Sequence, residues 1–344
     1  MTILDEVDII VCGGGNAGCV PAGRLAILDH NIQVLIIEAV FRPGIYLRNM
    51  KLDSKTASFY NSHPSEWLDG RRAIVPCAHI LGGGSSINFM MYTRASASDY
   101  DDFKAKGWTT KELIPFMKKH EAYQRACNNR GLHGFKGPIK VSFGNYTYPV
   151  MQDFLRASEP SGIPVTDDLQ DLVTRHLEEH WLKLINRDAG RRSGAAHAYI
   201  HSTRSKCDNL HLRCNTKVDK VIIENGRAVG VATVPTIYHS DTNPPRKVYR
   251  SRKQIIVSGG TLSSSLVLQQ SRIGSLPYIL CLRANPDVES FDDFILGDPD
   301  VQKRVFDKWN LKGTGPLATN GIDAGVKIRP TEEELAEMRT WPTN

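Results

Sequence analysis

The sequence predicts an α/β fold whose first part is a Rossmann-like dinucleotide-binding domain, and two observations carry this. The apolar run of residues 7–12 breaks into a glycine-rich turn at residues 13–18, and a helical pattern follows. A second apolar run, residues 34–37, then stops at Glu38. Strand, Gly-x-Gly-x-x-Gly turn, helix, strand and acidic end in this order are typical of a dinucleotide site.

The residue types in this first turn each have a physical reason. Gly13 permits a tight turn, Gly15 lets backbone N–H groups approach a pyrophosphate without a Cβ in the way, and Gly18 lets the helix pack close to the strand. Glu38 is placed to accept hydrogen bonds from a ribose diol. A purely structural turn is the alternative. The residues predicted to bind the cofactor here are Gly13, Gly15, Asn16, Ala17, Gly18 and Glu38.

A second glycine-rich stretch follows at residues 82–88, where three glycines precede two serines and an apolar helix start. Backbone of this kind can lie against a flat or anionic ligand. The alternative is a flexible loop. Two such cradles in one α/β chain favour a flavin dinucleotide over a nicotinamide one, because they suggest a cofactor that is reached from two sides.

Two later stretches extend the predicted sheet. Residues 210–234 alternate in the manner of a β-meander, with Asn225 and Gly226 as the hairpin signal. Residues 253–261 form an apolar strand that runs into glycines, and a helix starts after them. This third strand, glycine turn and helix predicts a first domain assembled from segments far apart in the sequence.

Bulk composition limits the class of protein. The chain of 344 residues is 41% hydrophobic and 23% charged, which is typical of globular proteins. Its apolar runs are too short to span a bilayer, and its N-terminus does not read as a signal peptide, so we expect a soluble intracellular protein. The net charge of +6 is scattered, and nucleic-acid binding is not expected. Seven cysteines without a Cys-x-x-Cys pair argue against disulfides or a cysteine zinc site.

Helical patterns and histidines occupy the middle of the chain. We expect a helix over residues 111–123 with Thr110 as its N-cap, and a short helix over residues 153–162. Residues 176–180 fit the His-x-x-Glu-His pattern of zinc peptidases, and His197 with His201 repeats the spacing. We interpret all four histidines as polar helix residues and expect no metal site, because no third ligand in a defined position can be identified.

The order of these motifs resembles the glucose–methanol–choline (GMC) oxidoreductases, flavoenzymes that oxidise alcohols, and within them the fungal alcohol (methanol) oxidases. The resemblance covers nearly the whole chain. It rests on residues 13–18 with Glu38, on residues 81–92, 215–218 and 258–264, and on residues 313–321.

The resemblance implies FAD as the cofactor and assigns residues to its parts. Backbone around Gly13, Gly15 and Gly18 would hold the pyrophosphate, Glu38 the adenosine ribose, and the main chain of Val218 the adenine. The residues implied to line the flavin and its ribityl chain, or to close the pocket, are Leu81, Gly82, Gly83, Gly84, Ser85, Asn88, Gly259 and Gly260. The implied reaction passes a hydride from a short primary alcohol, methanol or ethanol, to the flavin; a base takes the hydroxyl proton, and O2 is reduced to hydrogen peroxide.

The chain departs from the family pattern at several places. The catalytic histidine and its His or Asn partner belong to a C-terminal family segment that does not appear before Asn344, so the catalytic residues are unknown. Arg272 stands where a glycine is usual, Val40 where Glu-Ala-Gly is expected, and residues 275–288 lack the family's flavin-side motifs. We therefore expect an incomplete member with little or no oxidase activity. The alternatives are a flavin-binding remnant, a subunit of a complete homologue, or a nicotinamide dehydrogenase, which leaves residues 82–88 unexplained.

We expect a discontinuous FAD-binding domain, residues 1–145 and 205–275, and a partial α+β substrate or cap domain, residues 146–204 and 276–344. The expected partners are a small alcohol and O2, with no membrane, and a homo-oligomer is left open. Family alcohol oxidases are peroxisomal. Residues 341–344 are not a tripeptide of the Ser-Lys-Leu kind, so a cytoplasmic location is the alternative.

Overall fold

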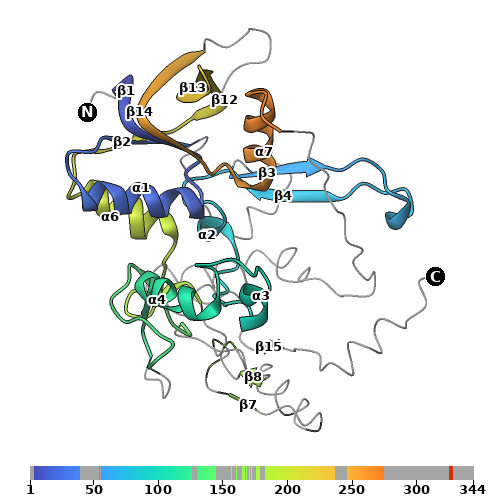
Figure 1. Ribbon diagram of the computed structural model, residues 1–344. Helices are drawn as coiled ribbons and strands as arrows, with labels where there is room; N and C mark the ends of the chain where they lie inside the picture. The colour runs from blue at the N-terminus through green and yellow to red at the C-terminus, as the bar shows by residue number, and fades with distance from the viewer. Residues whose placement is uncertain are drawn as a thin grey trace, which may run out of the picture. The chain divides into compact units, whose positions relative to one another are not determined.

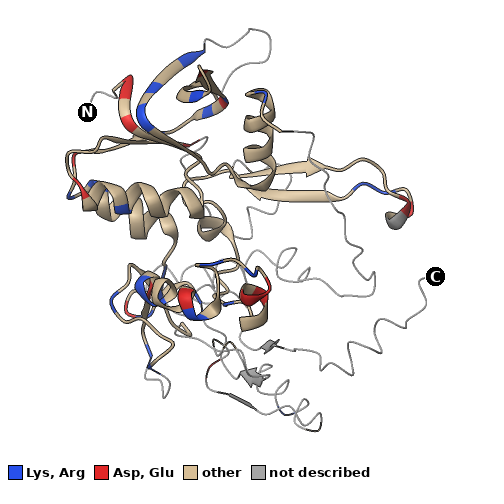
Figure 2. Cartoon of the chain, viewed as in Figure 1, with Lys and Arg blue, Asp and Glu red and all other residues tan. Residues whose placement is uncertain are grey.

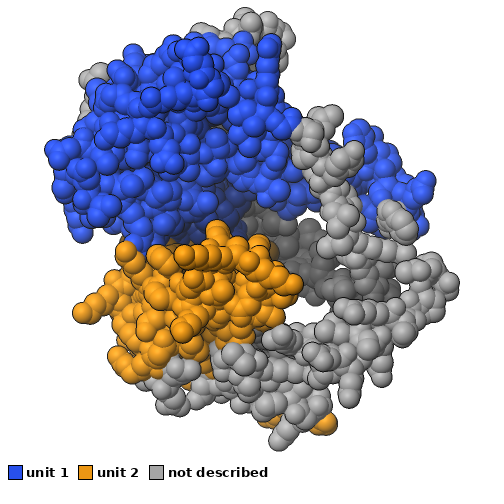
Figure 3. All heavy atoms as spheres, viewed as in Figure 1, with its two compact units in different colours: residues 1–88, 193–297 blue, residues 89–192, 298–344 orange. Residues whose placement is uncertain are grey.

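A computed structural model describes residues 4–38, 54, 56–125, 130–144, 183–236, 246–274 and 325–327, with scattered positions between 156 and 178 (Figure 1). The chain divides into two compact units, both discontinuous (Figure 3). Unit 1 comprises Met1–Asn88 and Ser193–Gly297, and unit 2 comprises Phe89–Arg192 and Asp298–Asn344. These limits differ from those of the predicted domains. The expected helix over residues 153–162, residues 275–288 and the motif at 313–321 lie outside the described residues, apart from single positions in the first range.

Unit 1 is built on a six-stranded sheet in the order β11-β2-β1-β14-β13-β12. Strands β11, β2, β1 and β14 run parallel, whereas β13 is antiparallel to both β12 and β14. The bounds are β1 Glu6–Cys12, β2 Val34–Ile37, β11 Leu210–Arg213, β12 Thr216–Glu224, β13 Arg227–Pro235 and β14 Lys247–Val257. This mixed sheet with its parallel half confirms the predicted fold class.

The parallel strands are apolar because helices cover both faces of the sheet. On β1, Ile10 belongs to the buried cluster that includes Val267 of α7 (Gly260–Gln270). The next residue, Val11, faces α1 (Asn16–Leu28), since a Cβ added at Gly18 would lie 3.1 Å from its Cγ1. Neighbouring strand residues point to opposite faces, so α1 and α7 cover opposite sides of the sheet.

One part of the predicted meander was wrong. Strands β12, β13 and β14 form it, but β11 pairs in parallel with β2 at the other edge of the sheet, with Leu210 opposite Val34. The alternation of residues 210–213 is compatible with either pairing. Tertiary contacts decide between the two pairings. The backbone N–H of Val34 donates to the carbonyl of Asn209 at 2.9 Å, which helps to hold β11 beside β2.

Short elements complete unit 1. They are the antiparallel hairpin of β3 (Ala57–Asn61) and β4 (Ile74–Ala78), the 3-10 helix η2 (Glu66–Leu68), α2 (Gly84–Ile87), the π-helix η4 (Ala196–His201) and α6 (Ser202–Arg204). After α7, Arg272 has φ +63°, a left-handed conformation. This explains why glycine is the residue expected there, because only glycine takes that conformation without strain.

Among its described residues, unit 2 contains two short helices and small sheets. Its elements are α3 (Ala97–Asp101), α4 (Thr110–His120), β5 (Glu121–Tyr123), β6 (Ile139–Val141), β7 (Val165–Thr166), β8 (His176–Glu178), β9 (Ile185–Asn186), β10 (Arg191–Arg192) and β15 (Gly325–Lys327). The helix predicted over residues 111–123 is wrong at both ends. Thr109, not Thr110, is the N-cap, and it forms a capping box with Glu112. The chain turns extended at Glu121, which pairs with β6.

The histidine pattern does not form the predicted helix. His176 lies in strand β8, so the i, i+4 helical face assumed for it and His180 is wrong, and His180 itself lies outside the described residues. His197 and His201 do share a helical segment, η4, with ring centroids 5.3 Å apart. Among the described residues, no group of three or more His, Cys, Asp or Glu side chains could hold a metal ion.

The Asp8 carboxylate links β1 to β14 and to the residue before β2. Its carboxylate accepts two hydrogen bonds from the Arg252 guanidinium on β14, at 3.2 and 3.0 Å, and one from the Gln33 backbone just before β2, at 2.9 Å. The hydrogen bonds from Arg252, against a smaller opposing effect of burial, lower the pKa of Asp8 to about 2. Asp8 therefore stabilises the sheet while it is ionised.

A buried charge network stands at the centre of unit 2. Glu121 is fully buried and accepts hydrogen bonds from Tyr92 (2.7 Å) and the Gly134 backbone (2.9 Å), with Arg94 2.9 Å away. His133 lies between Glu121, 2.8 Å from Nδ1, and Asp168, 2.7 Å from Nε2.

The balance of burial and hydrogen bonding makes this network charged. Burial opposes ionisation of His133, but the bonds to Asp168 and Glu121 outweigh it and raise the pKa of His133. Burial likewise opposes ionisation of Glu121, and His133 and Arg94 outweigh it, so the pKa of Glu121 is lowered.

Replacing Asp8 with Asn should lower the free energy of unfolding by about 1–2 kcal/mol at pH 7, a value reduced for the partly exposed Arg252. A lowered pKa gives stability above the ordinary carboxyl pKa that is lost as pH falls toward 2. The difference between variant and wild type, measured by urea unfolding, should therefore narrow below pH 4. The control is Asp219→Asn, whose carboxylate meets a half-exposed Arg246 at 3.0 Å and should cost less. A D8N effect that is independent of pH would contradict the assignment.

Replacing His133 with Gln should destabilise unit 2 most in mildly acidic solution. A raised pKa means that the stabilisation is fully present below pH 6.5 and is lost as pH rises through the folded-state value. Hydrogen exchange of β5 and β6 amides at pH 6 and pH 9 measures this, with exposed His30→Gln as the control. Equal destabilisation at both pH values would show that His133 acts as a neutral side chain.

Candidate cofactor-binding site

Three glycine-rich turns meet at the carboxyl ends of parallel strands in unit 1. The Gly13 N–H donates to the carbonyl of Ile37, the last residue of β2, at 2.9 Å. The Ser258 N–H donates to the carbonyl of Cys12, the last residue of β1, at 2.8 Å. In open α/β sheets ligands bind outside this edge, so the fold places all three turns where a ligand is expected.

The first turn leaves the N-terminus of α1 open. Gly15 is the N-cap, the cap has no side-chain hydrogen bond, and the first turn of this 13-residue helix holds no acidic residue. Asn16 and Ala17 are exposed. A Cβ added at Gly15 would find its nearest atoms only at 3.9 and 4.0 Å. Free N–H groups and a positive helix end attract an anion, so this terminus fits the pyrophosphate of a dinucleotide.

Close approach explains the other two glycines of the first motif. At Gly13, where φ is +100°, an added Cβ would lie 2.5 Å from the Ser258 carbonyl oxygen. At Gly18 an added Cβ would lie 2.0 Å from the Gly13 carbonyl oxygen. Both glycines therefore hold the turn against neighbouring backbone, whereas a Cβ at Gly15 would make only ordinary contacts, at 3.9 and 4.0 Å.

The second glycine stretch packs directly on the first. The Gly82 N–H donates to the Gly14 carbonyl at 2.7 Å. At Gly83, where φ is +54°, an added Cβ would lie 2.9 Å from the Cα of Gly15. Leu81 is buried, and its Cδ1 would lie 2.7 Å from a Cβ at Gly14. The structure thus brings together two cradles that are far apart in the sequence.

Polar contacts join the same two stretches. The Ser85 N–H donates to the Asn16 side-chain oxygen at 3.2 Å, and Asn16 Nδ2 would lie 3.9 Å from a Cβ at Gly84. Asn88 ends α2, with its N–H bonded to the Gly84 carbonyl at 2.7 Å. Gly84 and Asn88 are half-buried, so this short helix keeps one side accessible.

Glu38 lies beside the first turn and is 7% exposed. Its Oε2 accepts a hydrogen bond from the Gly14 N–H at 2.8 Å, which holds the turn as well as placing the carboxylate. Its backbone bonds Arg213 of β11 at 2.8 Å and Thr216 of β12 at 3.1 Å. Val218, the residue expected to meet adenine, follows two positions later on β12 and is 7% exposed.

The third glycine turn lies next to the first. Ser258 Oγ lies within donating distance of the Gly13 carbonyl (3.0 Å) and the Cys12 carbonyl (3.2 Å). Gly259 caps α7, Gly260 has φ +83°, and both are exposed. The sequence reasoning did not name Ser258 as a site residue, although its place directly after an apolar strand and before two glycines was a usable signal.

Residues 193–196 also lie at this site and, like Ser258, were not named as site residues from the sequence. The Ala195 N–H donates to Ser85 Oγ at 2.9 Å, and a Cβ at Gly194 would lie 2.9 Å from the Ser85 carbonyl oxygen. These residues stand outside every motif, and nothing in their pattern distinguishes them from an ordinary loop. The sequence therefore carried no signal that they lie at this site.

The two cysteines near the first turn are not reactive groups. Burial raises the pKa of both Cys12 and Cys19 to about 12. The Cys19 thiol donates instead to the Gly14 carbonyl at 3.1 Å. Both side chains serve packing and do not supply a thiolate.

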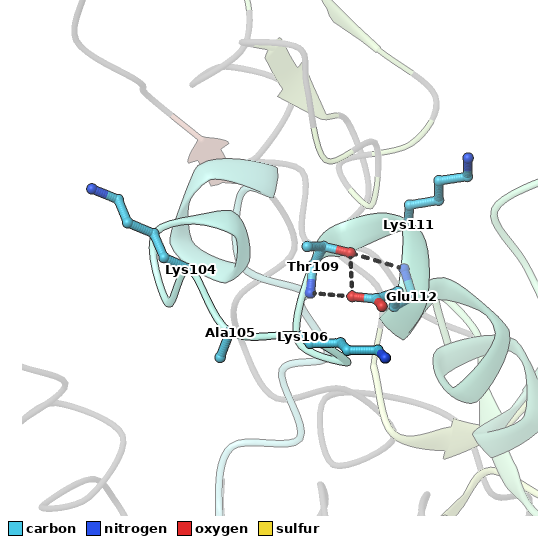
Figure 4. Close-up of a pocket in the computed structure, with 6 residues that line it drawn as sticks. All are labelled: Lys104, Ala105, Lys106, Thr109, Lys111 and Glu112. Carbon is cyan, nitrogen blue, oxygen red and sulfur yellow. Dashed lines mark hydrogen bonds between the residues drawn. The ribbon is translucent and has the colours of Figure 1, made fainter.

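A surface hollow of about 730 Å³ lies elsewhere, on unit 2 (Figure 4). It is lined by Lys104, Ala105, Lys106, Thr109, Lys111 and Glu112. The Glu112 carboxylate accepts from the Thr109 hydroxyl at 2.7 Å and from the Gly107 N–H at 2.9 Å. Its polar groups thus form the N-terminal cap of α4, and we interpret this hollow as a helix end and not as a ligand site.

Lys and Arg are interspersed with Asp and Glu along the described chain (Figure 2). Within the part of the chain that the structure describes, no helix is long and apolar enough to cross a membrane.

Replacing Gly83 with Ala should cost about 1–3 kcal/mol of unfolding free energy beyond backbone strain, because the new methyl group would press on Gly15. Gly226→Ala is the matched control, since Gly226 also has positive φ, +76°, but nothing lies within 4 Å of an added Cβ. Urea unfolding of both variants separates contact from strain. Equal losses in the two variants would mean that the two glycine stretches do not press on each other.

Comparison with known proteins gives the family. Residues 7–288 match the GMC oxidoreductase family. Alcohol oxidase 1 of Komagataella phaffii is 62% identical over 98% of this chain, and alcohol oxidase of Candida boidinii is 60% identical over 98%. The chain covers 56% of each of these relatives, and so spans about half their length. A formate oxidase structure from Aspergillus oryzae, 22% identical, superposes with a TM-score of 0.76 over 94% of this chain and 62% of that one. This chain belongs to the GMC oxidoreductases, a family of FAD-dependent enzymes.

Proposed function

We propose that the three glycine turns of unit 1 bind FAD. The open N-terminus of α1, from Gly15 to Ala17, would hold the pyrophosphate. Glu38 would bind the adenosine ribose, and the backbone of Val218 would lie against the adenine. The residues from Leu81 to Asn88, with Gly259 and Gly260, would line the flavin side. The observation that carries this is the uncapped, acid-free start of α1, where a Cβ at Gly15 would meet no atom closer than 3.9 Å.

We further propose that the protein takes part in oxidation of short primary alcohols, methanol or ethanol, to aldehydes with O2 as acceptor. The support is the high identity to alcohol oxidases over nearly all of this chain. When bound, FAD supplies the hydride acceptor for such a reaction. The residues of this chain would bind and orient the cofactor and exclude water from it. We assign no catalytic base among the residues that the structure describes.

The same similarity supports a proposal about location and assembly. We propose that the protein acts in the peroxisome, as the fungal alcohol oxidases do, and that it forms a homo-oligomer. Fluorescence microscopy of the tagged protein beside a peroxisomal marker tests the first proposal. Light scattering of the purified protein tests the second, and a monomeric mass would contradict it.

The purified chain should bind FAD and give the absorbance spectrum of a flavoprotein. Peroxide release with methanol and ethanol then tests oxidation separately. Bound flavin without peroxide would contradict the oxidase proposal for this chain and would favour the flavin-binding protein with little or no oxidase activity that is expected from the sequence. Absence of any bound flavin would contradict the site itself.

Gly15→Ser gives a sharper test of the site. Serine is a better N-cap residue than glycine. The backbone at Gly15 is extended, with φ −72° and ψ −169°, which serine can adopt. The apo variant should therefore unfold at the same or a higher temperature than the wild type. Its side chain would occupy the proposed pyrophosphate position, so FAD affinity should fall at least about tenfold, the scale of an overpacking penalty. Wild-type affinity in this variant would exclude the α1 N-terminus as the binding position.

A further inference from the structure

Residues 193–201, which we call the brace, contact both early glycine-rich segments. At one end, the Ala195 N–H donates to Ser85 Oγ at 2.9 Å in a buried bond. A Cβ at Gly82 would lie 2.9 Å from the Cβ of Ala196. The brace therefore packs directly against the second glycine stretch, at Gly82 and Ser85.

The other end of the brace packs against α1. A Cβ added at Gly23 would lie 2.1 Å from the Tyr199 carbonyl oxygen, so the helix and η4 touch backbone to backbone. The Arg24 guanidinium lies 5.7 Å from the centre of the Tyr199 ring. One continuous segment thus touches the helix that begins at the first glycine turn and the loop that forms the second. Its residues Ala196–His201 form a π-helix, a form often found at functional sites.

Ser85 is the joint between the brace and the loop. It is 6% exposed, and its hydroxyl donates to the Gly82 carbonyl at 2.7 Å while it accepts the Ala195 N–H. Its backbone N–H bonds Asn16 at the start of α1. A hydroxyl has one donor, so the Ser85 donor is used inside the protein and is not directed at a ligand.

We propose that the brace sets the spacing between the α1 N-terminus and residues 82–88, and that Ser85 is a positioning residue through which it controls FAD binding. This inference rests on the proposed function. It assigns Ser85 an indirect role, whereas the family resemblance placed it along the flavin. It also gives residues 193–201, considered from the sequence only for the spacing of His197 and His201, a part in cofactor binding.

The test compares Ser85→Ala with Ser251→Ala. Ser251 is also a buried serine of unit 1, in the middle of β14, with its hydroxyl 3.0 Å from the Asp8 carbonyl and 2.9 Å from the Gln254 carbonyl. Both variants should lower the unfolding temperature. Only Ser85→Ala should weaken FAD binding by about tenfold or more, because it leaves the buried Ala195 N–H without its acceptor. Only this variant should alter the visible circular dichroism of the bound flavin.

The outcomes separate the inference from the proposed function. Ser85→Ala that binds FAD with wild-type affinity and spectrum overturns the inference and leaves FAD binding intact. A wild-type chain that binds no FAD overturns both. If Ser85→Ala does not fold, hydrogen exchange of the Ala195 amide in the wild type decides. FAD should slow this exchange, and an unchanged rate would overturn the positioning role.

Discussion

The structure of unit 1 depends on close backbone contact among three turns at one edge of a sheet. Glycine makes this contact possible, because a Cβ at Gly13 or Gly18 would overlap neighbouring carbonyl oxygens. The parallel strands bring the turns to the same edge, and buried apolar side chains on both sheet faces hold the strands there. Removal of side-chain bulk leaves main-chain amides as the groups that face a ligand. That constraint is shared by the fold and by the proposed FAD site.

The two units bury different kinds of side chain. Unit 1 buries an apolar sheet and leaves the start of α1 polar and uncapped, which favours an anionic partner. Unit 2 buries charge: Glu121 pairs with Arg94 and bonds Tyr92 and His133, and His133 also bonds Asp168. Buried ionic groups destabilise a fold unless every partner is in place, so this network makes unit 2 depend on one precise arrangement. In unit 1 the ion pair of Asp8 with Arg252 joins β1 to β14.

The comparison of prediction with structure shows where local pattern is enough. Strand, turn and helix from β1 through α1 to β2 followed the pattern closely, as did β14 and α7. The errors arose where two structures share one pattern. Residues 210–213 alternate equally well in a meander and at a parallel edge, and His176 with His180 would lie on one face only if the segment were helical. In α4 the capping box of Thr109 and Glu112 fixed the start one residue earlier than expected.

By itself the sequence determined the fold class, the first two glycine turns, the acidic end at Glu38 and the family, because each depends on residue types at short, fixed spacing. Tertiary structure alone decided that β11 lies beside β2, that Ser258 closes the first turn, and that the brace of residues 193–201 joins α1 to Ser85. These contacts connect residues far apart along the chain. The local periodicity of a sequence does not indicate which distant residues will meet. These contacts are therefore determined only when the whole sheet has formed.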